Sequence, residues 1–213
     1  MLVKICGIST KKSAHTAIQN GADLIGFVFA TSTRQVTPEE AATITASLPP
    51  SIKKVGVFVN ETKDRIEHIA EKTRLDFIQL HGDESPAFAN SLSLPVIKAF
   101  PATKEALVNI EDYPCEYYLL DSPNGPYRGG NGTTFNWKMI EELNLHDKRI
   151  ILAGGLTPKN VQIAIETVRP HGVDVSSGVE TDGKKDAFKI RTFIINAKNK
   201  RKDDFHDLHN ASF

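Results

Sequence analysis

The hydrophobic positions of this chain form short apolar runs that alternate with amphipathic segments. The first run, Leu2–Cys6, is closed by Gly7. After it, Ala14, Ala17 and Ile18 recur at the spacing of one helical face. This unit predicts a strand followed by a helix. Seven further strands are predicted on the same grounds: Leu24–Phe29, Lys54–Val59, Phe77–Leu80, Val96–Phe100, Tyr117–Asp121, Arg149–Ala153 and Val173–Ser176.

A helical segment follows each predicted strand, so the unit occurs eight times. The other helices are expected through Ile66 and Ile69 and at Pro38–Leu48, Glu84–Leu92, Lys104–Ile110, Asn136–Leu143, Pro158–Val168 and Asp186–Ala197. Short apolar strands separated by helices are typical of a parallel sheet that is buried on both faces, and eight units close into a barrel. The sequence therefore predicts an α/β fold, the (β/α)₈ or TIM barrel. An open doubly wound sheet is disfavoured because no Gly-rich dinucleotide fingerprint follows the first strand.

The length of 213 residues suits one domain with one core. We expect the barrel to span residues 1–198. Residues 199–213 are polar and are expected to form a weakly ordered tail. His206 and His209 lie in this tail, but a third ligand at useful spacing is missing, so we expect no metal site there.

Composition limits the possible partners. Lys and Arg together number 26, as do Asp and Glu, so neither sign of charge dominates to attract nucleic acid or an acidic membrane surface. No apolar run reaches the ~18 residues of a membrane span, and the apolar stretch at the N-terminus is too short for a signal peptide. Cys6 and Cys115 are too few for a disulfide framework. We expect a cytoplasmic protein, and a monomer rather than a homodimer.

Two late strands end in small residues. The segment Ile150–Pro158 contains Gly154 and Gly155, and the following unit contains Ser177 and Gly178. Without bulky side chains, backbone N–H groups can close around a dianion at the start of a helix. This is also where a (β/α)₈ barrel most often binds a substrate phosphate. The pattern predicts a small phosphorylated substrate.

Catalytic groups of such barrels lie at the carboxyl ends of strands. The residues at these positions that can do chemistry are Cys6, Arg34, Gln79, His81, Asp83, Asp121 and Asp174. Three of these residues also have a structural alternative: Cys6 as a small core side chain, Asp121 as a helix cap or loop hydrogen bond, and Arg34 as an exposed loop residue.

Two further loops have features that point to local structure or motion rather than to catalysis. Asp83 and Glu84 lie where a helix is predicted to begin, so they are expected to complement its dipole. The segment Gly125–Gly132 is rich in glycine and suggests a mobile flap over the site, although a simply flexible connection has the same composition.

Six segments together resemble the signatures of the phosphoribosylanthranilate isomerase family, in the same order and over nearly the whole chain. They are Lys4–Ile8, Gly26–Phe29, Val55–Asn60, Gln79–Glu84, Leu152–Leu156 and Asp174–Glu180. The resemblance implies a (β/α)₈ barrel of tryptophan biosynthesis. It also implies conversion of N-(5-phosphoribosyl)anthranilate to 1-(2-carboxyphenylamino)-1-deoxyribulose 5-phosphate by an Amadori rearrangement, without cofactor or metal.

The resemblance also assigns roles. Cys6 becomes the general base, Asp121 the general acid, and Arg34 a partner of the anthranilate carboxylate. Asp174 is placed near the sugar. Gln79 is placed among the substrate-binding residues, and the phosphate is held at Gly154-Gly155 and Ser177-Gly178. Three departures from the family pattern are Thr33, Asn131 and Asn136, where Pro, Thr and Asp are usual.

An acid and a base of these types need shifted pKa values at neutral pH, with that of Asp121 raised and that of Cys6 lowered. The second shift can come from a nearby cation or from the iminium of the substrate itself. Lys4 lies two residues before Cys6 on the same side of its strand, so it is one candidate for that cation. The alternative for Lys4 is an ion pair with a buried carboxylate such as Asp174. Two other functions share the phosphate site, namely another sugar-phosphate isomerase, epimerase or lyase, and a ligand-binding module without turnover.

Overall fold

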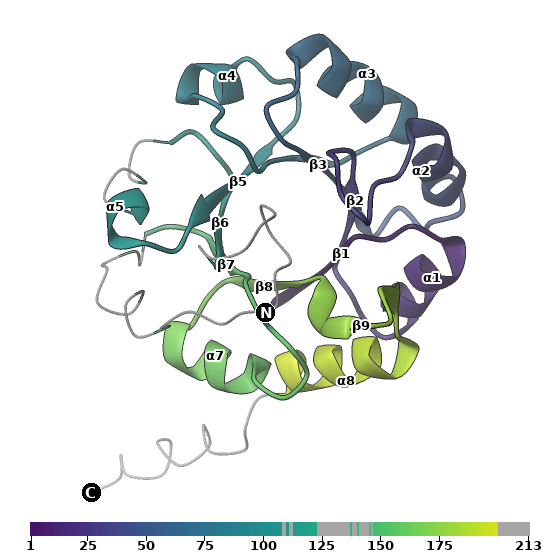
Figure 1. The fold of residues 1–213 in the computed structure, drawn as a ribbon, viewed down its shortest axis with the longest axis vertical. Helices are drawn as coiled ribbons and strands as arrows, with labels where there is room; N and C mark the ends of the chain where they lie inside the picture. Colours follow the sequence, from purple (N-terminus) through teal and green to yellow (C-terminus); the bar gives the residue numbers. More distant parts are fainter. Residues whose placement is uncertain are drawn as a thin grey trace, which may run out of the picture.

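Eight parallel strands form a closed barrel in which the strands follow their order in the sequence, as Figure 1 shows in a view down the barrel. In the computed structural model, which describes residues 1–107, 110, 113–122, 137, 140, 145 and 147–199, strand ends differ from the predicted ones by no more than one residue. The predicted (β/α)₈ fold is confirmed. The strands are β1 (Leu2–Cys6), β2 (Leu24–Val28), β3 (Lys53–Phe58), β4 (Phe77–Leu80), β5 (Val96–Pro101), β6 (Tyr117–Asp121), β7 (Ile150–Leu152) and β8 (Gly172–Val175).

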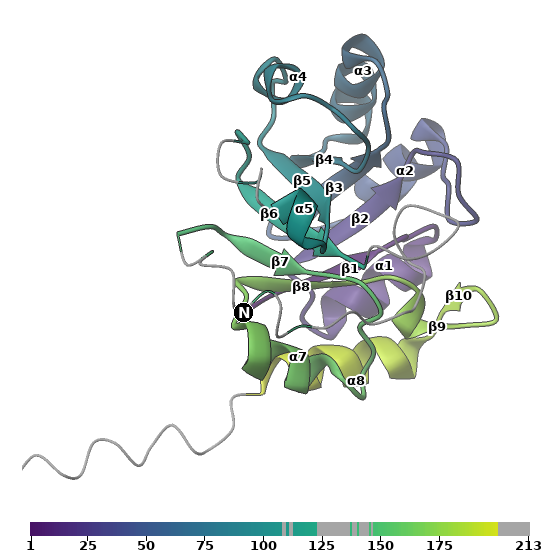
Figure 2. The ribbon, with the colours of Figure 1, turned by 60° about the vertical axis from the view of Figure 1, so that its left-hand side comes forward.

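Helices cover the outside of the barrel (Figures 1 and 2). They begin at side chains that satisfy free backbone N–H groups: Thr10 accepts from the N–H of Ser13, and Thr37 forms a capping box with Glu40. The helices are α1 (Lys11–Gln19), α2 (Pro38–Thr45), α3 (Lys63–Thr73), α4 (Pro86–Asn90), α5 (Lys104–Leu107), α7 (Val161–Val168) and α8 (Ala187–Lys198).

Some predictions fall on other parts of the chain. The flap Gly125–Gly132, the histidines of the tail and most of the helix predicted at Asn136–Leu143 lie outside the described residues. Within the described ones, no helix combines the length and the apolar character that crossing a membrane requires.

One prediction about α4 is wrong. The helix was expected to begin at Glu84, but it begins at Pro86 with Ser85 as its cap. The carboxylate of Glu84 does not face this helix end. It accepts hydrogen bonds from the ammonium of Lys98 and from the backbone N–H groups of Asn60 and Gly82.

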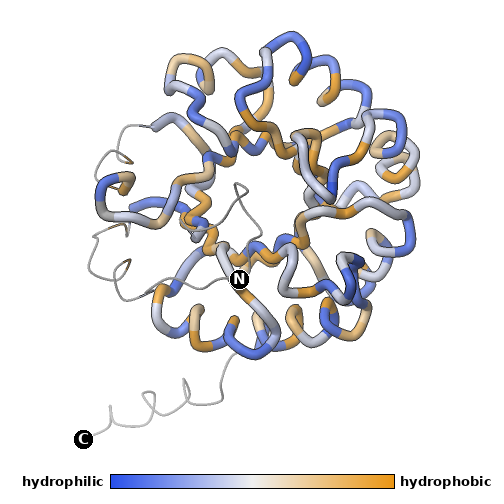
Figure 3. Tube along the Cα trace, in the orientation of Figure 1, coloured by the Kyte–Doolittle hydropathy of each residue, from blue (hydrophilic) through white to orange (hydrophobic). Residues whose placement is uncertain are grey.

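The apolar core has two parts. The larger one lies between the strands and the helices, and in Figure 3 the ring of strands is mainly hydrophobic while polar residues gather on the outer segments. The smaller one fills the barrel interior. It consists of residues from strands β2, β3, β5, β6 and β7 and of the residue that follows β7. They are Leu24, Val55, Ile97, Ala99, Leu119, Ile151 and Ala153. The interior is therefore packed, so a ligand has room only at a barrel end.

A buried ion pair crosses the seam where the barrel closes. Strand β1 pairs with β8 so that Lys4 lies opposite Asp174. The Nζ atom of Lys4 is 3.1 Å from Oδ1 of Asp174, and the two residues are 1% and 8% exposed. Gly26 on β2 makes room for this pair, since a Cβ there would lie 2.8 Å from Sγ of Cys6 and 3.2 Å from Nζ of Lys4.

The structure contains one motif that hydrophobic patterning did not predict. After β8 come a short 3₁₀ helix, η1 (Ser177–Val179), and a hairpin of two-residue strands, β9 (Glu180–Thr181) and β10 (Lys184–Lys185). Its turn places Asp182 and Gly183 at positive φ. Strands of two residues are too short to give a periodic signal, which is why the sequence did not indicate them.

We predict that Lys4→Met destabilises the protein by roughly 3 kcal/mol, because it leaves the Asp174 carboxylate buried without its partner. Burial lowers the pKa of Lys4, but Asp174 and Cys6 outweigh burial and raise it above the ordinary value. A raised lysine pKa stabilises the fold fully below the unfolded value near ~10.4, and this contribution is lost as pH rises through the higher folded value.

Urea unfolding at pH 8 measures the loss, and a series toward alkaline pH checks its sign. The double variant Lys4→Met/Asp174→Asn serves as control, since it removes both charges and should recover part of the stability. Equal stability of Lys4→Met and the parent at pH 8 would contradict the prediction.

Candidate active site

A cavity of about 560 Å³ opens at the carboxyl ends of the strands. This size suits a small-molecule site. Every substrate or catalytic residue predicted from the sequence lines it: Cys6, Arg34, Gln79, Asp121, Gly154, Gly155, Asp174, Ser177 and Gly178. His81 lines it as well, whereas Asp83 does not. The carboxyl ends of seven of the eight strands, or the residues that follow them, thus contribute to one pocket, and β5 does not.

Cys6 ends β1 and lies against the barrel interior, with only 7% of its surface exposed. Gly7 follows it with φ of 74°, a conformation that favours glycine, and turns the chain away from the pocket. Burial raises the pKa of the Cys6 thiol, while the ammonium groups of Lys4 and Lys185 lower it in part. The net direction is upward. In the unliganded protein the nearby cations therefore do not lower the Cys6 pKa below its ordinary value, because desolvation outweighs them.

Lys4 combines the two roles that the sequence left open, an ion pair with a buried carboxylate and a cation beside Cys6. Its Nζ atom pairs with Asp174, as in the alternative interpretation, and the same ammonium also lowers the pKa of Cys6 to some extent. Lys4 therefore acts on the thiol as a cation whose charge is already shared with a carboxylate.

Asp121 ends β6 and is 7% exposed. One carboxylate oxygen, Oδ1, accepts from the backbone N–H of Ser122 at 2.8 Å. The other, Oδ2, is 3.3 Å from Nε2 of His81. This arrangement contains the loop hydrogen bond considered as the structural alternative for Asp121 and leaves the carboxyl at the pocket wall.

Gln79 and His81 stand two residues apart at the end of β4. The amide Nε2 of Gln79 is 3.0 Å from Nδ1 of His81. Gln79 is 1% exposed, and its Oε1 atom is buried with no hydrogen-bond partner in the described part of the chain. A buried amide oxygen without a partner is costly, so this atom is suited to accept from a ligand group in the pocket.

Arg34 extends from the loop after β2 to the hairpin after β8. Its Nε and Nη2 atoms donate to the two carboxylate oxygens of Glu180, at 2.7 and 2.8 Å. Lys185 on β10 donates to the same carboxylate and to the backbone oxygen of Ser176. The bond to Glu180 raises the pKa of Arg34, and burial lowers the pKa of Lys185. Sequence reasoning missed Glu180 and Lys185, although Glu180 ends one of the six quoted motifs.

The two glycine-containing turns meet at the rim. Gly154 and Gly155 follow β7 with φ of 77° and 66°. Gly178 lies against the same turn, since a Cβ on it would be 1.8 Å from the backbone oxygen of Leu156. Ser177 begins η1, and only Ser176 separates it from the end of β8. The backbone of the two turns therefore packs closely and leaves their small residues at the pocket.

Metal chemistry has few candidate ligands here. Among the residues described, no group of three or more His, Cys, Asp or Glu side chains gathers closely enough to hold a metal ion. The titratable groups that line the pocket are instead one thiol, the carboxyls of Glu61, Asp121 and Asp174, one imidazole, and the guanidinium groups of Arg34 and Arg65, which are paired with Glu180 and Glu61.

A closed eight-stranded barrel whose carboxyl end gathers a thiol, carboxyls and glycine turns in one cavity defines a (β/α)₈-barrel enzyme. Comparison with known proteins identifies the family of this enzyme. The sequence profile of the N-(5'phosphoribosyl)anthranilate (PRA) isomerase family matches residues 3–196. An N-(5'-phosphoribosyl)anthranilate isomerase of Oceanobacillus iheyensis is 50% identical over 201 residues, which cover 94% of this chain and 98% of that protein. The chain belongs to the N-(5'-phosphoribosyl)anthranilate isomerase family.

Solved structures give the same family. The crystal structure of phosphoribosyl anthranilate isomerase from Thermotoga maritima is 42% identical and superposes with a TM-score of 0.84, covering 93% of this chain and 99% of that one. A second structure of the enzyme was determined in complex with reduced 1-(o-carboxyphenylamino)-1-deoxyribulose 5-phosphate. It is 40% identical, has a TM-score of 0.82, and covers 93% of this chain and 98% of that chain.

We predict that neither cysteine of the unliganded protein reacts readily with iodoacetamide at pH 7. Burial raises the pKa of Cys115 to about 11 and also raises that of Cys6, so both thiols stay protonated until the pH is well above neutral. Mass-spectrometric mapping of alkylated peptides across pH gives the two profiles. A phosphorylated product analogue should protect Cys6, which lines the pocket, and not Cys115. Rapid labelling of Cys6 at pH 7 would contradict this prediction.

Proposed function

We propose that this pocket isomerises N-(5-phosphoribosyl)anthranilate to 1-(2-carboxyphenylamino)-1-deoxyribulose 5-phosphate by acid–base catalysis, as expected of an isomerase of this family in tryptophan biosynthesis. The observation that carries the proposal is that the thiol of Cys6, from β1, and the carboxyl of Asp121, from β6, line one cavity whose rim is formed by the glycine turns of β7 and β8. An aldose–ketose rearrangement of this kind needs one acid and one base.

Asp121 is the proposed acid. Its carboxyl proton passes to the ring oxygen of the ribose as the C1–O bond breaks and the nitrogen lone pair forms a C1=N bond. The resulting iminium makes the hydrogen on C2 acidic. Cys6, as thiolate, takes that proton, the C2–H electron pair becomes the C1=C2 bond of an enolamine, and the π electrons of the C1=N bond return to the nitrogen as its lone pair. Tautomerisation of the enolamine gives the ketone.

The pKa of Cys6 is raised in the unliganded protein, so removal of the C2 proton requires that substrate binding first lower this pKa. The thiol must be deprotonated when the iminium is present, and a cation beside a buried thiol lowers its pKa because opposite charges attract strongly where water is excluded. The substrate iminium supplies that cation, added to the partial effect of Lys4 and Lys185. We therefore propose that Cys6 ionises in the complex and not in the free protein.

The substrate's two ends have separate partners in this proposal. The phosphate binds the backbone N–H groups of the turns at Gly154-Gly155 and Ser177-Gly178, where no side chain blocks a dianion. At the other end, Arg34 attracts the anthranilate carboxylate with the positive charge that Glu180 only partly balances. Asp174 and Gln79 face the sugar, which lies between the phosphate and the anthranilate. The unpartnered oxygen of Gln79 is available to accept from a sugar hydroxyl.

The proposal requires neither a cofactor nor a metal, since every proton transfer is assigned to a side chain or to the substrate. We further propose that the chain acts as a monomer, because all these groups come from one chain, although a relative from Thermotoga maritima is described as dimeric. Two free cysteines suit a reducing compartment such as the cytoplasm.

The direct test follows the loss of substrate fluorescence on addition of the purified protein. Cys6→Ala and Asp121→Asn should each lower kcat by ~10²-fold or more with little change in KM, because proton transfer acts in the transition state and not in substrate binding. Circular dichroism controls for folding. A folded Asp121→Asn enzyme with near-normal kcat would refute the assignment of the acid, and absence of turnover by the parent protein would refute the function.

Arg34→Met should behave differently. Loss of the cation removes ground-state attraction for the substrate carboxylate, so KM should rise about tenfold or more while kcat falls less. Glu180→Gln is the matched comparison: it keeps a side chain of the same shape but weakens the bidentate hold on Arg34. Steady-state kinetics of the two variants test this, and unchanged KM in Arg34→Met would return the residue to a surface role.

A further inference from the structure

Beside the pocket, but not in its wall, lies a second buried ion pair. The Nζ atom of Lys98, on β5, is 2.9 Å from Oε2 of Glu84, in the segment between β4 and α4. Their side chains are 5% and 3% exposed. Neither residue lines the cavity. The mechanism above uses neither charge, although burying both is costly unless each is well bonded.

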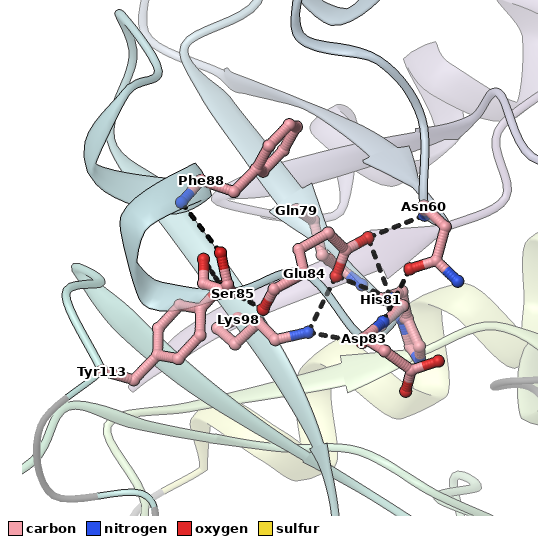
Figure 4. Close-up of polar contacts among 10 residues, drawn as sticks. Asn60, Gln79, His81, Asp83, Glu84, Ser85, Phe88, Lys98 and Tyr113 are labelled. Atoms are coloured by element: carbon pink, nitrogen blue, oxygen red, sulfur yellow. Dashed lines mark hydrogen bonds and ion pairs between the residues drawn. The ribbon is translucent and has the colours of Figure 1, made fainter.

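The pair is well bonded, and its bonds hold the backbone of Gly82 after β4 and of Asn60 after β3 (Figure 4). Lys98 also donates to the backbone oxygen of Gly82 at 2.6 Å. The carboxylate of Glu84 accepts from the backbone N–H of Gly82 at 3.0 Å and from that of Asn60 at 2.8 Å. Asn60 in turn accepts from the backbone N–H of Asp83 at 2.7 Å through its Oδ1 atom. We call Asn60, Glu84 and Lys98 the β4-loop clamp.

The clamp leaves the segment little freedom. A Cβ on Gly82 would lie 2.2 Å from Oδ1 of Asn60 and 2.6 Å from Oε1 of Glu84, so the backbone packs directly on the clamp side chains. Asn60 itself holds a left-handed conformation with φ of 50°, which asparagine tolerates better than most residues. Tyr113 adds a bond from its hydroxyl to the backbone oxygen of Glu84 at 3.0 Å.

The residue that this segment presents to the pocket is His81. Its Nε2 atom is 3.3 Å from Oδ2 of Asp121, and Gln79 holds its other ring nitrogen. With the amide nitrogen of Gln79 donating to Nδ1, the ring proton lies on Nε2, which faces Oδ2 of Asp121 and donates to it. Such a donor stabilises the carboxylate that remains when Asp121 has given up its proton.

We propose that the β4-loop clamp consists of positioning residues for the isomerisation: Asn60, Glu84 and Lys98 fix the backbone at Gly82 and Asp83 and thereby hold His81 against Asp121. The proposal rests on the proposed function in assigning the acid to Asp121. None of the three residues lines the cavity. Their effect on the reaction passes through the imidazole of His81.

This route gives a signature that a purely structural ion pair lacks. The double variant Lys98→Met/Glu84→Gln removes both charges, so neither is left buried alone. We expect kcat to fall about tenfold with KM nearly unchanged, because a misplaced imidazole weakens a proton transfer and not the binding of substrate. His81→Asn should lower kcat by a similar factor. Adding the clamp substitutions to His81→Asn should then cost little more, because both changes remove the same interaction.

The matched control is the ion pair of Lys54 with Asp76, which joins the beginnings of β3 and β4 at 3.0 Å, at the opposite end of the barrel. Lys54→Met/Asp76→Asn should reduce stability and leave kcat unchanged. Asn60→Gly provides a second clamp variant if the charge variant does not fold. It keeps the left-handed backbone accessible and removes the acceptor for Asp83, so it should lower kcat in the parent and not in His81→Asn.

A measurement without turnover separates this proposal from the proposed function. In ¹⁵N-histidine NMR of the unliganded protein, His81 should show its ring proton on Nε2 and a hydrogen-bonded Nδ1, and that signature should be lost in the clamp variants and kept in the Lys54→Met/Asp76→Asn control. Unchanged His81 signals in the folded clamp variants would overturn the proposal, as would losses in kcat that multiply fully with His81→Asn. A protein that gives the NMR result but no turnover would refute the function, and with it the catalytic part of this proposal, while showing that the clamp still holds His81 in place.

Discussion

The buried pair of Lys4 and Asp174 is the constraint on which the site depends. It lies inside the barrel at the seam between the first and last strands, so the charges that close the fold are also the charges beneath the pocket. Two ions are kept from water only where each is bonded to the other, which fixes the register of β1 against β8. That register places the thiol of Cys6 two residues beyond Lys4 at the rim. The ion pair between Lys4 and Asp174 thus contributes both to closing the barrel and to placing the proposed base.

The same principle recurs around the barrel mouth. Three of the ion pairs in the described part of the chain connect different elements there: Lys4 with Asp174, Arg34 with Glu180, and Lys98 with Glu84. Each lies beside a residue with a proposed role in the reaction. Cations that are already paired change the pKa of a neighbouring thiol less than free ones, which is consistent with the raised pKa of Cys6 in the unliganded protein. The pocket is therefore held in shape before substrate supplies its own charges.

Local patterns allowed the barrel and much of the site to be predicted from the sequence. The strands follow from short apolar runs, and the positions of Cys6, Asp121 and the glycine turns follow from the rule that functional groups lie at strand ends. The failures concern partners distant in sequence. Glu180 is 146 residues from Arg34, and Glu84 was assigned to its nearest helix because Lys98 on the next strand left no local signal. The direction of the Cys6 pKa shift depends on how completely the folded barrel excludes water, which composition does not record.

Removal of the C2 proton by Cys6 is the central claim, and an isotope measurement tests it most directly. Substrate carrying deuterium at C2 is converted in a single turnover, so that product release does not hide the chemical step. The account predicts that the deuterated substrate reacts more slowly than the protiated one, and that Cys6→Ser, with a far weaker base at the same place, slows the step further while the isotope effect persists. Equal single-turnover rates for the two substrates in the parent, or a Cys6→Ser rate equal to that of the parent, would contradict it.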